Sequence, residues 1–151
     1  MKLNLRAAAS GQLAIVAGLI IAVGATAAVW LQSARAADAS KHRVFELRTY
    51  TTAEGRLDAL HKRFRDQTNK FFAKHGMEII GFWTPADGAA AKNTLVYMLA
   101  FPSREAAEKS WKDFQADPGW KAAKEESEKD GKIVEKVVSV FLNPTDFSPL
   151  K

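Results

Sequence analysis

The alternation of apolar and polar residues from residue 44 onward predicts a chain of strands and helices. Strands are predicted over four segments rich in β-branched, aromatic and other apolar residues: 44–52, 77–84, 94–101 and 133–142. Apolar residues at helical spacing predict helices over 56–75 and 103–116, and Asp117 followed by Pro118 predicts the start of a third, short helix. The order β-α-β-β-α-(α)-β is that of a ferredoxin-like α+β fold, an antiparallel four-stranded sheet with its helices on one face.

Polar and helix-breaking residues separate these elements. Gly76 is the expected end of the first helix, and Ser103 is the expected N-cap of the second. We expect a loop over 85–93, a solvated charged face over 124–132 and a C-terminal tail over 143–151.

Both faces of the predicted sheet are apolar, whereas an antiparallel sheet with one solvated face should alternate apolar with polar residues. Along the third strand, Leu95, Tyr97 and Leu99 alternate with Val96 and Met98, and the helices can cover only one of the two faces. An exposed apolar sheet face promotes aggregation. A second copy packed sheet against sheet would cover it, so we expect an isologous homodimer. The alternative is that the C-terminal tail or loops cover this face.

Composition and charge narrow the class of protein without defining a reaction. The chain has 151 residues, of which 47% are hydrophobic, and no cysteine, which is typical of a globular domain rather than a disordered or disulfide-stapled chain. Its net charge of +5 arises partly from the first 36 residues, which hold three basic residues and no acidic one, so the remainder has a net charge of only +2. We therefore expect no nucleic-acid partner.

Residues 1–36 have the pattern of an export signal. Lys2 and Arg6 precede an apolar run over 13–31, and the sequence ARA at 34–36 fits a small-x-small cleavage site. We therefore expect a periplasmic or secreted protein.

Cleavage after Ala36 would leave a linker over 37–43 and one domain over 44–151. The apolar run over 13–31 is 19 residues long, close to the roughly 20 that span a bilayer. The alternative is therefore an uncleaved inner-membrane anchor, and this segment is the only part of the chain for which we expect membrane contact.

No motif for metal binding, nucleophilic catalysis or phosphate binding is readable. The histidines are His42, His61 and His75. The last two share a predicted helix, but residues 14 positions apart are separated by about 21 Å in a helix, so they cannot hold one ion. Without cysteine there is no ordinary zinc site, and we expect no metal. The sequences G-x-S-x-G, G-x-G-x-x-G and the P-loop are absent.

The strongest candidate site is a row of polar residues on the first strand. Glu46, Arg48 and Tyr50 alternate with Leu47 and Thr49 and therefore lie on one face. Buried charges must be paired, so we interpret the row as a structural Glu–Arg network at the dimer interface. The alternative is a polar patch inside a pocket under the helices.

His61 and four aromatic residues complete the candidates. His61 lies on the apolar face of the first helix, where we expect a core residue, with a pocket base or a haem ligand as the alternative. Trp83, Tyr97, Trp111 and Trp120 are expected in the core rather than in a ligand-binding cage. The first three are the candidate pocket aromatics if a pocket exists.

Six short motifs, taken in order, resemble the NIPSNAP family. They are ELRTY at 46–50, KHG at 74–76, GFW at 81–83, SREA at 103–106, DPGW at 117–120 and PTDFSPL at 144–150. The resemblance implies a dimeric α/β barrel, a class that includes cofactor-free monooxygenases, haem-degrading enzymes and proteins with no known chemistry. It brings no catalytic motif that can be carried over.

We therefore expect a homodimer of the cell envelope that binds a small apolar or acidic ligand or a partner protein, with no cofactor. The alternative is a cofactor-free monooxygenase or a haem-handling enzyme that uses the cavity between helices and sheet, and monooxygenase-like chemistry is the best enzymatic hypothesis. Polar groups that converge inside an apolar pocket would favour the enzyme, whereas a sealed core would favour the binding protein.

Overall fold

The sheet has four antiparallel strands in the order β2-β3-β1-β4, in a computed structural model that describes residues 43–151. β1 (Val44–Thr52) is central and pairs with β3 (Thr94–Phe101) and β4 (Val134–Leu142), while β2 (Glu78–Trp83) pairs with the other side of β3. Each strand begins and ends within one residue of its prediction. The leader and residues 37–42 of the linker lie outside the described residues.

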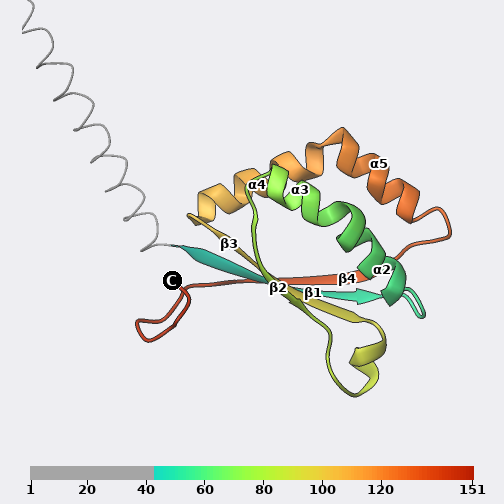
Figure 1. Ribbon diagram of the computed structural model, residues 1–151, viewed down its shortest axis with the longest axis horizontal. Helices are drawn as coiled ribbons and strands as arrows, with labels where there is room; N and C mark the ends of the chain where they lie inside the picture. The colour runs from blue at the N-terminus through green and yellow to red at the C-terminus, as the bar shows by residue number, and fades with distance from the viewer. Residues whose placement is uncertain (1–42) are drawn as a thin grey trace, which may run out of the picture. The chain divides into compact units, whose positions relative to one another are not determined.

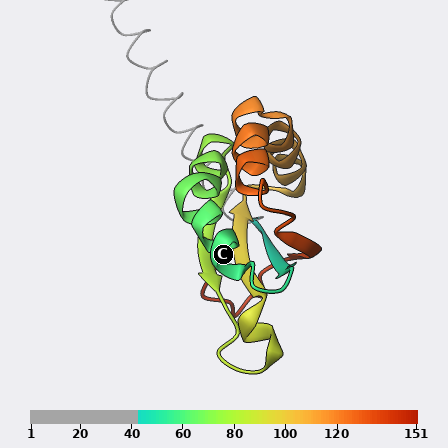
Figure 2. The ribbon, with the colours of Figure 1, turned by 90° about the vertical axis from the view of Figure 1, so that its right-hand side faces the viewer.

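The helices cover one face of this sheet (Figure 1). The helical segments are α2 (Leu57–Arg63), η1 (Phe64–Thr68), α3 (Asn69–Lys74), η2 (Ala89–Lys92), α4 (Arg104–Ala116) and α5 (Pro118–Ser127). Figure 2 shows the segment from α2 to α3 lying beside the segment from α4 to α5 in a single layer. The short helix η2 belongs to the predicted loop between β2 and β3. The predicted ferredoxin-like α+β fold is confirmed.

The predicted first helix contains one wide turn, because η1 is a π-helix. Leu60, Phe64, Thr68 and Phe72 follow one another at intervals of four residues, and all are buried. In a continuous α-helix, each interval of four would rotate the side chain by about 40°, so Leu60 and Phe72 would lie about 120° apart. The wider π turn removes this drift, and the Thr68 hydroxyl donates to the Arg63 carbonyl at 3.3 Å within it.

The core lies between the helices and the sheet. Its buried members are Leu60, Phe64, Phe72, Met77, Leu95, Tyr97, Leu99, Phe101, Ala107, Phe114 and Ile133. The predicted helix ends are confirmed: Gly76 follows α3 with φ +71°, a conformation that favours glycine, and the Ser103 hydroxyl accepts from the backbone N–H of Ala106 at 3.2 Å.

The other face of the sheet is apolar and uncovered along β4. Val138, Val140 and Leu142 are between 38 and 46% exposed, and Val140 lies beside Leu47 of β1 on this face. The C-terminal tail leaves these side chains exposed, and its own Phe147 is 84% exposed. The tail therefore does not replace a partner on this face, which we call the open sheet face.

Trp83 at the end of β2 was predicted as a core residue, and this prediction is wrong. Its side chain is half exposed, and its ring folds back against Gly81, where a Cβ atom would lie 2.8 Å from the indole. Glycine at position 81 therefore provides the space that the ring occupies.

Within residues 43–151, none of the helices has the length and apolar character needed to cross a membrane. In the same part of the chain, no three His, Asp or Glu side chains come together in a way that could hold a metal ion.

Candidate functional site: a cleft between the helices and the sheet

A cleft of about 560 Å³ opens between the helix layer and the half of the sheet formed by β1 and β4. Its aromatic lining consists of Tyr50, Phe64, Phe72, Trp111, Phe114 and Trp120. Its charged lining consists of Arg48, Arg63, Lys121, Lys124, Glu128 and Lys132. The cleft therefore combines apolar walls with a strongly cationic set of side chains.

The polar row of β1 lies on the helix-covered face, beneath this cleft. Glu46 is 1% exposed, and its Oε2 accepts from the indole N–H of Trp111 at 2.5 Å. Its Oε1 accepts from Arg48 Nη1 at 2.9 Å and from the Ser139 hydroxyl at 2.5 Å. The Glu–Arg network is thus internal to one chain. Glu46, Arg48 and Tyr50 therefore lie on the side of β1 opposite the open sheet face, and a second copy packed on that face would not meet them. Their predicted place at a dimer interface stays a prediction.

Arg48 belongs to this network and also lines the cleft. Its guanidinium carbon lies 4.0 Å from the centre of the Trp111 ring, and its buried Nε has no hydrogen-bond partner among the described residues. Next to it, the Tyr50 hydroxyl accepts from the Tyr97 hydroxyl at 3.1 Å. Burial raises the pKa of Tyr97 well above its ordinary value. The Tyr97 phenol is therefore a hydrogen-bond donor at neutral pH and not a base.

Arg63, from the last turn of α2, is the second arginine of the cleft. Its side chain is only 4% exposed, and its Nη1 donates to Glu128 Oε1 at 3.0 Å. Its guanidinium carbon lies 5.8 Å from the centre of the Trp120 ring, and its buried Nε also has no partner within the described part of the chain. Because Glu128 follows α5 directly, this ion pair ties the C-terminal end of α5 to α2.

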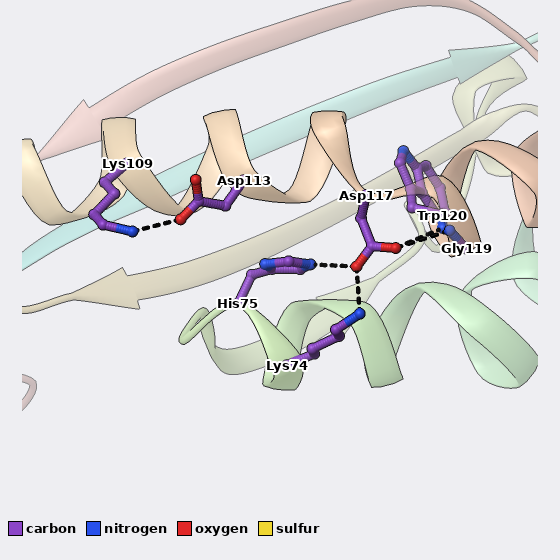
Figure 3. A network of polar contacts seen from close by, with 7 residues as sticks. All are labelled: Lys74, His75, Lys109, Asp113, Asp117, Gly119 and Trp120. Carbon is purple, nitrogen blue, oxygen red and sulfur yellow. Dashed lines mark hydrogen bonds and ion pairs between the residues drawn. The ribbon is translucent and has the colours of Figure 1, made fainter.

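Asp117 fixes the other end of α5 (Figure 3). Its Oδ1 accepts from the backbone N–H of Gly119 at 2.8 Å, as expected of an N-cap. Its Oδ2 lies 2.6 Å from Lys74 Nζ and 2.8 Å from His75 Nε2. The Lys74 ammonium, followed by the His75 ring, holds the pKa of Asp117 well below its ordinary value. His75, predicted to favour only its own helix end, therefore also joins α3 to α5.

His61 lies away from the cleft. It lines a second pocket of about 310 Å³ together with Trp83, Phe82, Arg65 and Asn69. The candidate residues of the sequence are therefore divided between two pockets. His61 and Trp83 line the second pocket, whereas Arg48 and Tyr50 of the β1 row line the cleft.

Of the candidate aromatics, Trp111 lines the cleft, whereas Tyr97 is fully buried. The expectation of a core position is therefore correct for Tyr97.

Sequence analysis missed Arg63 and the contribution of α5. Trp120 was assigned to the core, and it does stack on Phe114 with ring centres 4.5 Å apart, but it also lines the cleft. Glu128 belongs to the charged run that was predicted to be solvated. The only signal for Arg63 was its position three residues after Leu60, near the apolar side of the helix, and its pairing with a residue 65 positions away has no local signature.

Comparison with family models finds one match, the NIPSNAP model, over residues 45–149. The match covers well over half of the chain. The chain belongs to the NIPSNAP family. The resemblance of its motifs to NIPSNAP proteins is thereby confirmed, and the match includes both the β1 row and the whole of α5. A comparison with curated proteins finds no significant match.

Crystal structures of NIPSNAP proteins share the fold. One from Agrobacterium tumefaciens is 26% identical, with 74% of this chain and 96% of that chain covered and a TM-score of 0.64. A NIPSNAP-like domain protein from Burkholderia xenovorans is 17% identical, with 72% and 90% covered and a TM-score of 0.63.

A putative antibiotic biosynthesis monooxygenase from Nitrosomonas europaea is similar to this NIPSNAP chain in fold only. It is 12% identical, with 72% of this chain and 95% of that chain covered and a TM-score of 0.51. A similarity at this level of identity shows the fold alone.

Proposed function

We propose that this NIPSNAP protein is a homodimer that binds a small ligand in the helix–sheet cleft and carries out no reaction on it. The observation that carries the proposal is the cleft itself: about 560 Å³ lies within the range of roughly 300–1,000 Å³ typical of small-molecule sites. Its six aromatic side chains supply the apolar walls that are usual for such a site, and its six charged side chains make it more polar than most.

The way α5 is held supports a preformed site. Asp117 joins its N-terminal end to α3, and Glu128 joins its C-terminal end to Arg63. These ion pairs keep Trp120 in position as a wall of the cleft. A wall fixed before binding lowers the entropy that a ligand must offset.

A neutral fluorescent dye tests the proposal without assuming a charge on the ligand. N-phenyl-1-naphthylamine should gain fluorescence with the wild type and much less with Val137→Trp, because Val137 lines the cleft on the edge strand β4. Ala122→Trp is the control, since Ala122 is exposed on α5 and does not line the cleft. Equal dye signals from wild type and Val137→Trp would exclude the cleft as the site at which the dye binds.

Export and dimerisation are part of the same proposal. The leader supports export, and the mature chain recovered from the cell envelope should begin at Ala37. The exposed valines of the open sheet face support the dimer.

A cofactor-free monooxygenase is the second candidate function. Arg48 and Tyr50 are polar groups beside the aromatic walls of the cleft, which is the arrangement that we expected of an enzyme. Against this, Glu128 is the only carboxylate that lines the cleft, and it is paired with Arg63. The described residues of the cleft therefore offer no free base, which is why we rank binding first.

Haem handling has less support than either. Histidine is a common axial ligand of haem iron, and no histidine is among the described residues that line the cleft. His61, the expected haem ligand, lines the second pocket. Adding haemin to the purified protein should therefore not produce the absorbance bands of histidine-ligated haem, and the appearance of those bands would revive this alternative.

A further inference from the structure

The two arginines of the cleft share one arrangement. Arg48 donates through Nη1 to Glu46, and Arg63 donates through Nη1 to Glu128. Each guanidinium faces an indole ring, Trp111 for Arg48 and Trp120 for Arg63. Each also has a buried Nε that donates to no acceptor among the described residues.

Such unmet donors are uncommon in a folded protein. Buried polar groups almost always have a hydrogen-bond partner, and leaving a donor without one costs free energy. Arg56, outside the cleft, also has a buried Nε without a partner among the described residues, so the two unmet Nε donors do not identify a ligand by themselves. Both guanidinium groups line the cleft, and an acceptor from outside the chain would meet their other N–H groups, since Nε itself is enclosed.

The remaining charges specify an anion. The residues that line the cleft include five cationic side chains, the two arginines and Lys121, Lys124 and Lys132, and a single carboxylate, Glu128. Glu46 neutralises part of this charge from below, so a net positive charge remains. A cationic cleft with partly desolvated walls attracts anions and repels cations.

The aromatic walls of the cleft indicate the shape of the uncharged part of the ligand. Trp111, Trp120 and Phe72 present aromatic surface to the cleft, and aromatic side chains favour stacked or edge contacts with flat rings. A flat apolar body can lie among these rings while an acidic group at its end reaches a guanidinium.

We propose that the ligand is a carboxylate with a flat apolar body, held by hydrogen bonds from Arg48 and Arg63. The proposal rests on the function proposed above, since it requires the cleft to be a ligand site. A carboxylate suits a guanidinium because its two oxygens match the fork of N–H donors. The indole rings beneath the guanidinium groups help to hold that fork in place.

Three probes with the same ring test the choice of charge. Naphthalene-2-carboxylate, naphthalene-2-methanol and naphthalen-2-ylmethylamine differ only in the group that they carry, and their affinities can be measured by isothermal titration calorimetry on the full mature chain. The carboxylate should bind at least about tenfold more tightly than the alcohol, because a charged hydrogen bond adds that much or more. The amine should bind most weakly.

Charge-conserving variants test the two arginines. Arg48→Lys and Arg63→Lys keep the positive charge beside Glu46 and Glu128 but lose the planar fork. Each should weaken carboxylate binding about tenfold and weaken alcohol binding much less. Arg65→Lys is the control, since Arg65 lies on the same helical segment but lines the second pocket. If Arg48→Lys does not fold, as judged by its melting curve, Arg63→Lys carries the test alone.

The outcomes separate this inference from the proposed function. If the neutral dye binds in the cleft but the carboxylate binds no better than the alcohol, the cleft remains a ligand site and its selectivity for a carboxylate is disproved. Unchanged carboxylate binding by both lysine variants would likewise overturn the role of the arginines. If neither the dye nor any of the three probes binds, the proposed function fails and this inference fails with it.

Discussion

Glu46 is the residue on which the polar floor of the cleft depends. It is a fully buried carboxylate that accepts hydrogen bonds from the side chains of Arg48, Ser139 and Trp111. The three donors replace the hydrogen bonds to water that this carboxylate loses on folding. Only Arg48 among these donors brings a compensating charge.

Removing the Arg48 charge should therefore destabilise the folded protein. Arg48→Met should lower the free energy of unfolding by about 3 kcal/mol, near the low end for breaking a buried ion pair, because Glu46 keeps its bonds to Ser139 and Trp111. The measurement is urea denaturation of the wild type and the variant. Arg104→Met is the control, since Arg104 pairs with the exposed Glu108, and its loss should cost less than about 1 kcal/mol.

The same variant tests where the row lies. Because Arg48 faces the helices, Arg48→Met should leave self-association unchanged while it lowers stability. A variant that melts like the wild type but no longer associates would contradict this and place Arg48 at an interface.

Asp117 makes stability depend on pH in the acidic range. Its pKa in the folded protein lies well below the ordinary value of 3.8, so the folded state keeps this carboxylate charged while the unfolded chain takes up a proton below about pH 4. The stabilisation is therefore complete above the ordinary pKa and is lost as pH falls toward the folded pKa. Asp117→Asn should melt at a lower temperature than the wild type at pH 7, and the difference should narrow as the pH falls below 4.

Asp113 provides the control for this experiment, because its carboxylate pairs with Lys109 on the surface of α4 (Figure 3). The exposed pair contributes little, so Asp113→Asn should change the melting curve only slightly. Equal pH dependence of the wild type and Asp117→Asn between pH 7 and pH 3 would show that the Asp117 contacts do not stabilise the fold.

At the scale of elements, alternation and helical spacing were enough to predict the strands and the helix layer. Alternation also put Glu46, Arg48 and Tyr50 on one side of β1. It could not show which side, because both faces of the sheet are apolar. The contact that decides the question, between Glu46 and Trp111, joins residues 65 positions apart, and no local pattern encodes such a distance.

The π turn was missed for a related reason. A spacing of four residues fits the same face of an α-helix over short stretches, so Leu60, Phe64 and Thr68 read as an ordinary helix. The widening becomes visible only in the burial of Phe72 and in the bond from Thr68 to the Arg63 carbonyl. This turn contributes Phe64 and Thr68 to the lining of the cleft, and Arg63, one of the two parts of the site that sequence analysis missed, directly precedes it.

Thr68→Val tests how far the side-chain bond supports the turn. Valine keeps the shape of threonine and loses only the hydroxyl, so unfolding should become easier by about 1 kcal/mol, as is typical for one buried hydrogen bond. Thr52→Val is a matched control: Thr52 is equally buried, but its hydroxyl has no partner within the described residues, so its removal should be neutral or stabilising. Denaturation should therefore show a loss of stability in Thr68→Val and none in Thr52→Val. An equal loss of stability in both variants would show that the Thr68 hydrogen bond has no special role.

At the scale of the whole molecule, the two faces of the sheet have different roles. The helix-covered face carries the charged network and the cleft. The open sheet face carries the apolar side chains Val138 and Val140 of β4, with Lys136 beside Thr51 near the start of that strand. β4 contributes to both, because Val137 lines the cleft and Val138 lies beside Thr49 on the open sheet face. Substitutions at two neighbouring positions of β4 can therefore test self-association and ligand binding separately.

Val137 and Val138 form a matched pair, since they are 42 and 43% exposed on opposite faces of one strand. If the open sheet face is the dimer interface, Val138→Glu should weaken association by at least about 100-fold, because an unpaired carboxylate would be buried at the interface. Val137→Glu should remain a dimer, because its carboxylate would stay in the solvated cleft. Size-exclusion chromatography with light scattering on residues 37–151 measures both. A wild type that is monomeric at micromolar concentration, or loss of the dimer in Val137→Glu as well, would show that the chain does not associate through this face.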